Sequence, residues 1–154
     1  MSVEPPPLRP FGLRLHYDGR WTHEGHPITH ARLRAAFDRG VRFLPEDGKY
    51  VVEIGRFRGE IEVEEAGFFV RDIDRETGEI ALSDRTRESL DLGSLRSSRR
   101  DSALLCTVKR HLLPGGLPAR FTHGAQSELL AGLEQTPGGP ALRIAGALRI
   151  LPDL

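Results

Sequence analysis

The sequence predicts an α+β protein, and three observations support this class. One helix-like segment follows an early strand, a run of strand-like segments comes next, and a second helix-like segment lies among later strands. Helices separated by runs of strands are typical of α+β folds and argue against a parallel sheet of βαβ units. With 154 residues, the chain fits one ordinary domain or two small lobes that share a core.

The composition excludes several classes of function. The 22 basic and 22 acidic residues give no net charge, so nothing attracts the whole protein to nucleic acid or to a membrane surface. The single cysteine, Cys106, excludes an internal disulfide and a cysteine-rich metal site. The N-terminus lacks a signal-peptide pattern, and no stretch reaches the ~18 uncharged apolar residues of a membrane span. We therefore expect a soluble, cytoplasmic protein.

The first half of the chain divides into a tail, a strand, a helix and a hairpin. Residues 1–11 are rich in proline, which favours an extended, solvated tail. Leu13 to Tyr17 alternates apolar and polar residues as a strand does, and Asp18-Gly19 then marks a turn. Further on, strands predicted around residues 50–54 and 61–63 are joined by a loop at 55–59 and followed by a third strand from Phe68.

The predicted first helix has recognisable ends. Thr29 is expected to be its N-cap, because a threonine hydroxyl accepts a hydrogen bond from an orphaned backbone amide. Ile28 and Leu33 then have the spacing of a hydrophobic staple. Gly40 stands where a left-handed glycine often ends a helix, and Val41 would fold back on the last turn.

In the second half, a turn at 74–78 joins two strands, and a polar, arginine-rich region at 84–101 contains few apolar anchors. Residues 103–113 have the apolar content of a core strand, which would bury Cys106 as a small hydrophobe. A second helix is predicted after residue 121, and one or two final strands follow the break at 137–140. The helix residues expected to face inward are Ala125, Leu129, Leu130 and Leu133.

The most distinctive stretch is WTHEGHPITH, residues 21–30. Trp21 is the only tryptophan, and core packing is the simplest role for its large ring. Gly25 and Pro27 would shape the entry to the helix, whose first amides, at Ala31 and Arg32, are a natural acceptor for an anion.

The histidines of this stretch, His23, His26 and His30, have a spacing that resembles that of metal ligands. Pro27 and the expected cap put the first two in a loop, so we expect exposed or hydrogen-bonded histidines and no metal site. The glutamates at 60, 62, 64 and 65 are expected to form a solvated strand face. The sequence contains no GxSxG motif and no known phosphate loop, so catalytic residues and cofactors are not predicted.

Several patterns together resemble a known family. They are W-x-H-x-G-x-P-I from Trp21 to Ile28, DG-x-Y from Asp47 to Tyr50, and L-x-A-R from Leu117 to Arg120. In order and spacing they are similar to the bacterial proteins grouped as domain of unknown function 1285, over roughly residues 13–151. The chain is identified as a divergent member, because Gly67 and His123 depart from the family pattern.

The resemblance implies an α+β core of two small lobes, each a mainly antiparallel sheet with one helix, the second superficially like a pleckstrin-homology fold. The expected lobes are residues 12–73 and 74–154, after the tail. The resemblance also implies a small, nucleotide-like ligand between the lobes and a role in signalling.

We therefore expect a non-enzymatic ligand-binding or sensory module whose site uses Trp21, His23, Gly25, Arg56 and Arg120, the arginines supplying positive charge. One alternative is a protein–protein interaction domain or homodimer that uses an exposed sheet edge. The other is a metal-dependent hydrolase built on the three histidines.

Overall fold

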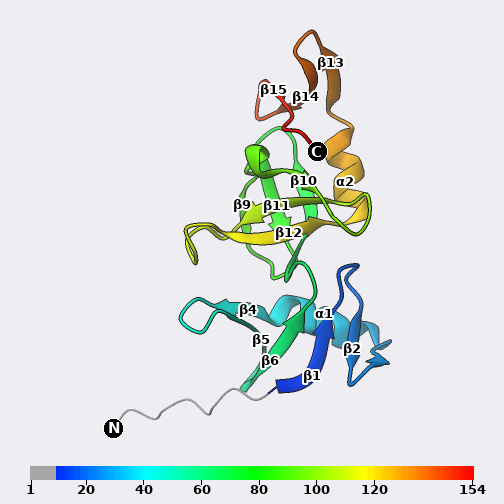
Figure 1. Ribbon diagram of the computed structural model, residues 1–154, viewed down its shortest axis with the longest axis vertical. Helices are drawn as coiled ribbons and strands as arrows, with labels where there is room; N and C mark the ends of the chain where they lie inside the picture. Colours follow the sequence, from blue (N-terminus) through cyan, green and yellow to red (C-terminus); the bar gives the residue numbers. More distant parts are fainter. Residues whose placement is uncertain (1–9) are drawn as a thin grey trace. The chain divides into compact units, whose positions relative to one another are not determined.

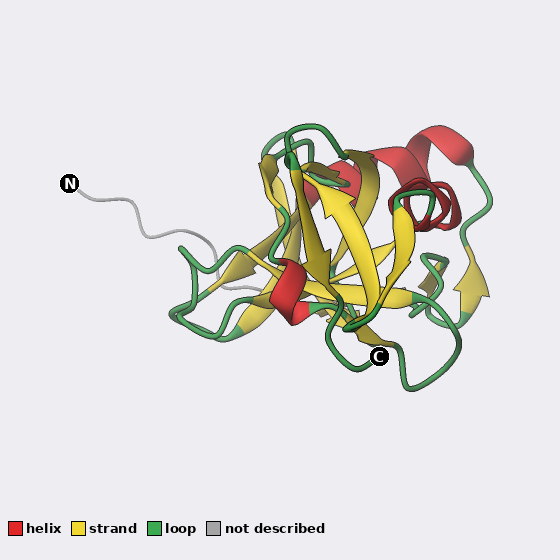
Figure 2. Cartoon of the chain, turned by 90° about the horizontal axis from the view of Figure 1, so that it is seen from above, coloured by secondary structure: helices red, strands yellow, loops and turns green. Residues whose placement is uncertain are grey.

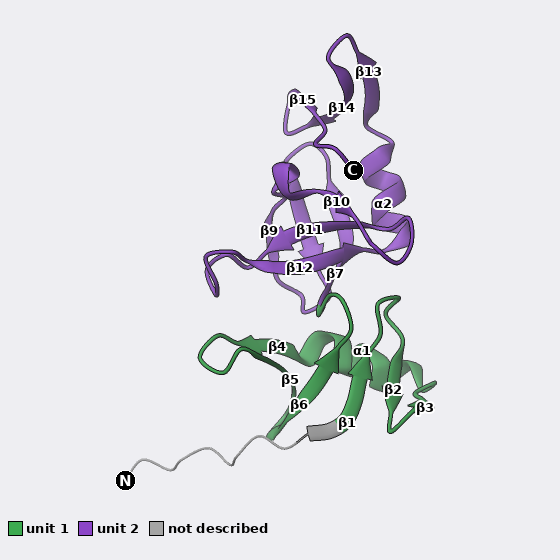
Figure 3. Ribbon diagram, in the orientation of Figure 1, with its two compact units in different colours: residues 1–67 green, residues 68–154 purple. Residues whose placement is uncertain are grey.

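The structure is a computed structural model that describes residues 10–154, and it divides into two compact units (Figure 1). The first unit ends at Gly67 and the second begins at Phe68, at the start of a strand (Figure 3). Most of the expected tail, residues 1–9, lies outside the described residues, whereas Pro10 already begins a strand. Strands and loops make up most of the described chain, with few helices (Figure 2).

The first unit contains one helix and a six-stranded sheet of order β3-β2-β1-β6-β5-β4. Two antiparallel three-stranded segments are joined by a parallel pairing of β1 with β6, in which Arg14 lies opposite Glu62. The helix α1 packs against β5. The elements are β1 (Pro10–Leu15), β2 (Trp21–His23), β3 (His26–Pro27), α1 (Ala31–Gly40), β4 (Val41–Leu44), β5 (Lys49–Ile54) and β6 (Phe57–Val63).

Helix α1 begins one residue later than predicted, so the prediction of Thr29 as its cap is wrong. His30 is the N-cap, and its Nδ1 accepts a hydrogen bond from the backbone N–H of Leu33 at 3.2 Å. An imidazole nitrogen satisfies an orphaned helix amide as a threonine hydroxyl does. Leu33 is not buried as a staple residue would be, because 41% of its surface is exposed.

The expected left-handed ending of α1 is also wrong. Gly40 is the last helical residue, its φ is not positive, and Val41 continues directly into β4, a strand that the sequence did not predict. A glycine is needed here for space, because a Cβ on Gly40 would collide with the carbonyl oxygen of Glu53 on β5. Close approach of the helix end to the sheet thus explains this residue.

The predicted hairpin of β5 and β6 is confirmed, but its loop is shorter than expected. Ile54 pairs with Phe57, so only Gly55 and Arg56 form the turn, and the rest of the predicted loop belongs to β6. Gly55 has a φ of 58°, a backbone conformation that residues other than glycine rarely adopt.

The second unit contains a six-stranded sheet, a helix and a small three-stranded sheet. The large sheet has the order β10-β11-β12-β7-β8-β9, and the small one β13-β14-β15. The elements are β7 (Phe68–Asp74), β8 (Glu79–Leu82), β9 (Arg87–Ser89), the short 3₁₀ helix η1 (Leu92–Ser94), β10 (Arg96–Ser97), β11 (Leu104–Val108), β12 (Leu117–Phe121), α2 (His123–Leu130), β13 (Leu133–Thr136), β14 (Gly139–Ile144) and β15 (Ala147–Ile150).

The two large sheets repeat one topology. In the second unit, β7-β8-β9 and β10-β11-β12 are antiparallel segments joined by a parallel pairing of β7 with β12, just as β1 pairs with β6 in the first. In the first unit the helix lies between the two segments, whereas α2 follows the second segment and packs on β7 and β12. The predicted α+β class, with one helix beside each mainly antiparallel sheet, is confirmed.

The prediction for the second helix is correct in part. Thr122 caps α2 by accepting the N–H of Ala125 at 3.3 Å, and Ala125 and Leu129 are buried. The inward placement of Leu130 and Leu133 is wrong, since 36% and 42% of their surfaces are exposed. Leu133 lies beyond the helix in β13, where the chain turns into a small sheet that the sequence predicted only in its last strands.

Neither α1 nor α2 has the length and hydrophobicity that a helix needs to cross a bilayer, and this holds for every helix of residues 10–154.

Candidate functional site

Trp21 lies in the core of the first unit, as its ring size suggested. Only 1% of its surface is exposed, and its ring packs against that of Phe37 on α1 with centroids 5.3 Å apart. Its indole N–H donates a hydrogen bond to Oδ1 of Asp38 at 2.8 Å. A ligand could therefore contact the ring of Trp21 but could not accept a hydrogen bond from its N–H, which is already bonded to Asp38.

The segment after Trp21 folds into a tight hairpin. His23 and His26 are paired across the turn, and Glu24 and Gly25 both have positive φ angles, 49° and 83°. A two-residue turn with both central residues left-handed favours glycine at its second position. A Cβ on Gly25 would meet no atom within 4 Å, so this glycine shapes the turn and does not allow a close contact.

An apolar hollow of about 290 Å³ opens between this hairpin and α1. Leu33 and Phe57 at its rim are 41% and 49% exposed, whereas Leu13 and Phe37 are buried. His23 supplies the imidazole of the lining. Apolar concavities with few polar groups are the common form of small-molecule sites, although this one is small. The lining residues are Leu13, His23, Ile28, Leu33, Phe37 and Phe57.

A second hollow, of about 260 Å³, shares Ile28 with the first. Trp21 lines this second hollow, and Phe37, whose ring packs against that of Trp21, lines the first. Apart from Pro27, the other lining residues of the second hollow are polar or basic, and none of the residues that line it in the described structure is acidic. They are Arg20, Thr22, Pro27, Thr29 and Arg34.

The two arginines predicted as ligand residues have different surroundings. Arg56 is exposed in the β5–β6 turn, next to Phe57 of the apolar hollow. Arg120 lies on β12 in the second unit, and its guanidinium makes two hydrogen bonds to the Asp101 carboxylate, at 3.1 and 2.6 Å. The Arg120 hydrogen bonds, with further help from the N–H of Ala103, lower the pKa of Asp101. Of the five predicted residues, the first unit holds Trp21, His23, Gly25 and Arg56.

The three histidines of the opening stretch have separate roles. His23 and His26 flank the hairpin turn, and His30 caps α1. Within residues 10–154, no group of three or more histidine, cysteine or carboxylate side chains is placed to hold a metal ion.

The glutamates of β6 and the residues after it take part in ion pairs. Glu64 lies 3.2 Å from the Arg14 guanidinium and 3.4 Å from Nδ1 of His16, while Glu60 lies 3.3 Å from the Lys49 ammonium. These partners partly neutralise the acidic strand face, and the Glu64 side chain is only 11% exposed, so the expected solvated face is not solvated throughout.

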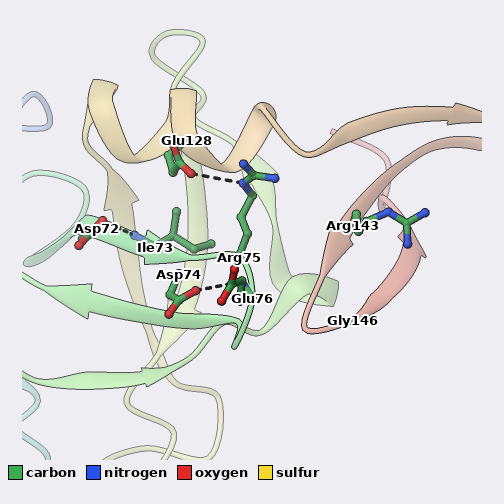
Figure 4. A pocket seen from close by; sticks show the side chains of 8 residues that line it. All are labelled: Asp72, Ile73, Asp74, Arg75, Glu76, Glu128, Arg143 and Gly146. Carbon is green, nitrogen blue, oxygen red and sulfur yellow. Dashed lines mark hydrogen bonds and ion pairs between the residues drawn. The ribbon is translucent and has the colours of Figure 1, made fainter.

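A larger hollow, of about 730 Å³, lies in the second unit beside the β7–β8 turn, α2 and β14 (Figure 4). Arg75 points towards Glu128 of α2, and their nearest atoms are 3.4 Å apart. Arg143 is paired with Glu134 at 2.8 Å, and Asp74 accepts the backbone N–H of Glu76 at 2.9 Å. Exposed charged side chains that are already paired with one another are typical of a solvated protein surface, so this hollow is not chosen as the candidate site.

Sequence reasoning missed a buried ion pair in the second unit. The Lys109 ammonium lies 2.7 Å from Oδ2 of Asp84, and the two side chains are only 7% and 4% exposed. It also donates to the Thr86 hydroxyl at 3.1 Å and lies 4.8 Å from the centre of the Phe68 ring. The sequence did contain a signal for this pair. Lys109 is one of only two lysines, against 20 arginines, and it directly follows an apolar strand.

Burial would raise the pKa of the Asp84 carboxyl, but the hydrogen bonds from Lys109 and Thr86 and the Lys109 charge outweigh it, so this pKa lies below its ordinary value. Asp84 is therefore ionised at neutral pH, and its contact with Lys109 ties the β8–β9 turn to the end of β11. It lines none of the three hollows, which indicates a structural role.

No protein-family model and no curated protein sequence matches the chain. Two solved structures of DUF1285 family proteins are similar to it. The protein from Silicibacter pomeroyi DSS-3 is 18% identical, with a TM-score of 0.63 over 95% of this chain and 82% of that one. The protein from Shewanella baltica OS155 is 15% identical, with a TM-score of 0.51 over 78% of this chain and 91% of that one. The resemblance noted in the sequence is thus confirmed as a shared fold.

Proposed function

We propose, from the fold shared with the DUF1285 proteins and the hollows of the first unit, that this chain is a non-enzymatic module that binds a small organic ligand. The ligand would place an apolar or flat part in the hollow lined by Leu13, Ile28, Phe37 and their neighbours. The resemblance to the family supports a nucleotide-like ligand and a role in signalling. From the same resemblance we propose that the second lobe is like a pleckstrin-homology fold.

The observation that carries this proposal is the apolar surface left open beside a rigid aromatic pair. Leu33 and Phe57 are large side chains, 41% and 49% exposed, that face one concavity with buried Leu13 and Phe37. Covering such surface releases about 25 cal/mol for each Å² removed from water. Because the lining comes from strands, a helix and the short segment before that helix, and not from long loops, little ordering cost opposes binding.

Four of the residues predicted from the sequence fit this site in different ways. His23 lines the apolar hollow, Trp21 lines the adjoining one, and Arg56 is next to Phe57. Gly25 forms the turn that places His23. The proposed site does not use Arg120, which is held by Asp101 in the second unit.

Trp21 is the only tryptophan, so its fluorescence reports on both hollows. We expect one member of a panel of nucleotides and small apolar molecules to change this fluorescence and to raise the melting temperature. Leu33→Ala should weaken that binding about fivefold to tenfold, the loss expected for removing part of an apolar contact. If nothing in the panel, at millimolar concentration, changes either signal, the proposal is wrong.

Leu130→Ala is the matched control. Leu130 is also a helical leucine that is 36% exposed, but it lies on α2 and lines none of the three hollows. It should leave ligand affinity unchanged. An equal loss from both variants would indicate a general effect on stability and not a site at Leu33.

A second candidate function, self-association through a sheet edge, rests on β15. All four residues of this edge strand are exposed, and the alternation of a strand puts Leu148 and Ile150 on the same face. Exposed apolar edge strands invite pairing with another chain. Light scattering at several concentrations tests this, because a dimer that disappears in a Leu148→Ser, Ile150→Ser variant would favour it and a monomer throughout would exclude it.

A further inference from the structure

The hollow that contains Arg34 adjoins the apolar hollow, and this arrangement limits the chemistry of the ligand. Ile28 lines both hollows, while Trp21 and Phe37, one from each, are in ring contact at 5.3 Å. Ile28 is therefore the side chain at which a small molecule in one hollow would reach the other.

The charges of the second hollow do not cancel. The Nε of Arg20 donates to Oδ2 of Asp18 at 2.7 Å. Burial would raise the pKa of the Asp18 carboxyl, but hydrogen bonds from Arg20 lower it further than burial raises it, so at neutral pH Asp18 is ionised and balances Arg20. Arg34 has no ion-pair partner among residues 10–154. One positive charge thus remains uncompensated in this hollow.

Uncharged donors accompany this charge. Thr29 lines the same hollow, and its hydroxyl makes no hydrogen bond within the described part of the chain. The Thr22 hydroxyl, by contrast, is already bonded to Nε2 of His16 at 2.9 Å. A guanidinium beside a free hydroxyl suits an oxyanion, because both donate hydrogen bonds and the planar guanidinium can hold two oxygens at once.

We propose that the ligand of the first unit is a singly charged apolar acid, whose oxyanion contacts Arg34 and Thr29 while its apolar body lies beyond Ile28 in the hollow of Leu33 and Phe57. This inference rests on the proposed function, since it requires that the apolar hollow bind a ligand. A single uncompensated charge favours a monoanion, such as a carboxylate, over a neutral molecule of the same shape.

The test compares octanoate with octanol, which share a chain length and differ in charge, by titration of Trp21 fluorescence. In the unmodified protein, octanoate should bind about tenfold more tightly than octanol, as expected for a charge-assisted hydrogen bond. Arg34→Gln should reduce that preference to about onefold, mainly by weakening octanoate. Arg34→Lys should keep part of the preference, and added salt should weaken octanoate alone.

Arg39→Gln is the control, because Arg39 lies on the same helix, is exposed and lines neither hollow. Its preference for octanoate should match that of the unmodified protein. Equal binding of the two probes, or a preference that survives Arg34→Gln, overturns this inference and leaves the apolar site intact. Failure of both probes to bind overturns the apolar site and this inference together.

Discussion

The indole N–H of Trp21 and the carboxylate of Asp38 are joined by a hydrogen bond of 2.8 Å, which links β2 to α1. Because Trp21 is 1% exposed, its N–H would be without water if Asp38 were absent. The bond therefore fixes the hairpin of His23 and His26 relative to the helix. This hairpin and this helix line the apolar hollow together with Leu13 of β1 and Phe57 of β6.

Replacing Asp38 with alanine should lower the free energy of unfolding of the first unit by about 1–3 kcal/mol, because a buried donor loses its acceptor. Urea titration followed by Trp21 fluorescence measures this change. Asp38→Asn keeps an acceptor oxygen and should cost less. Equal costs for the two variants would show that the hydrogen bond does not matter.

Gly40 and Gly124 are both helical glycines, and alanine should act on them in opposite directions. At Gly40 the new Cβ collides with the carbonyl oxygen of Glu53, so we expect a loss of roughly 2 kcal/mol or more. At Gly124 a Cβ meets no atom within 4 Å, so higher helix propensity should stabilise by about 0.5 kcal/mol. Thermal melts of both variants check this, and a stabilised Gly40→Ala would contradict the close approach of α1 to β5.

The buried pair of Lys109 and Asp84 should be costly to break from one side. Lys109→Met leaves a buried carboxylate without its cation, which typically costs about 3–5 kcal/mol. Adding Asp84→Asn to that variant removes the isolated charge but keeps an acceptor for Thr86, so much of the stability should return. Chemical denaturation of the single and double variants measures both steps. A double variant no more stable than Lys109→Met would contradict the account.

The same pair predicts how stability depends on pH. The pKa of Asp84 in the folded protein lies below its ordinary value of 3.8, so the unfolded chain binds a proton there first as the pH falls. The contribution of Asp84 is thus complete above about pH 5 and disappears as the pH drops through the folded pKa. Below about pH 5, the unfolding free energy of the unmodified protein should decrease more steeply than that of Asp84→Asn. Parallel curves would exclude this role.

Cys106 provides a separate probe for the second unit. Its side chain is buried, and burial raises the pKa of the thiol to about 12, so almost no thiolate exists near pH 8. A thiol-specific disulfide reagent should leave the folded protein unmodified and react once the second unit unfolds. Trp21 reports only on the first unit, so the two signals measured in one urea series would show whether the units unfold together. Rapid reaction without denaturant would contradict the burial.

Local patterns allowed several elements to be predicted correctly. The alternation around Tyr50 and Ile61 indicated a hairpin, and a second helix was predicted after residue 121, where the structure has α2. Errors came where a local rule competed with packing. Gly40 had the position of a left-handed glycine but is required by its contact with Glu53, and Leu130 fitted an apolar stripe that no neighbouring element covers.

The site could be foreseen only in part. The chemical density of residues 21–30 directed attention to Trp21 and His23, which line the two adjoining hollows. Arg34 was not singled out, because an exposed helical arginine resembles any solvated charge until its neighbours are known. Leu33 and Phe57 are far apart in the chain, and periodicity carries no information on which distant residues line the same hollow.

Residue types and their short-range spacing were enough to predict the α+β class, the strands with clear alternation, the buried states of Trp21 and Cys106, and the resemblance to the DUF1285 proteins. The parallel pairings of β1 with β6 and of β7 with β12, the repeated strand order, and the two hollows that share Ile28 became visible only in the folded protein. These features join residues that are distant in the chain. Which distant surfaces meet depends on how the whole unit buries its apolar area, and no local pattern specifies that choice.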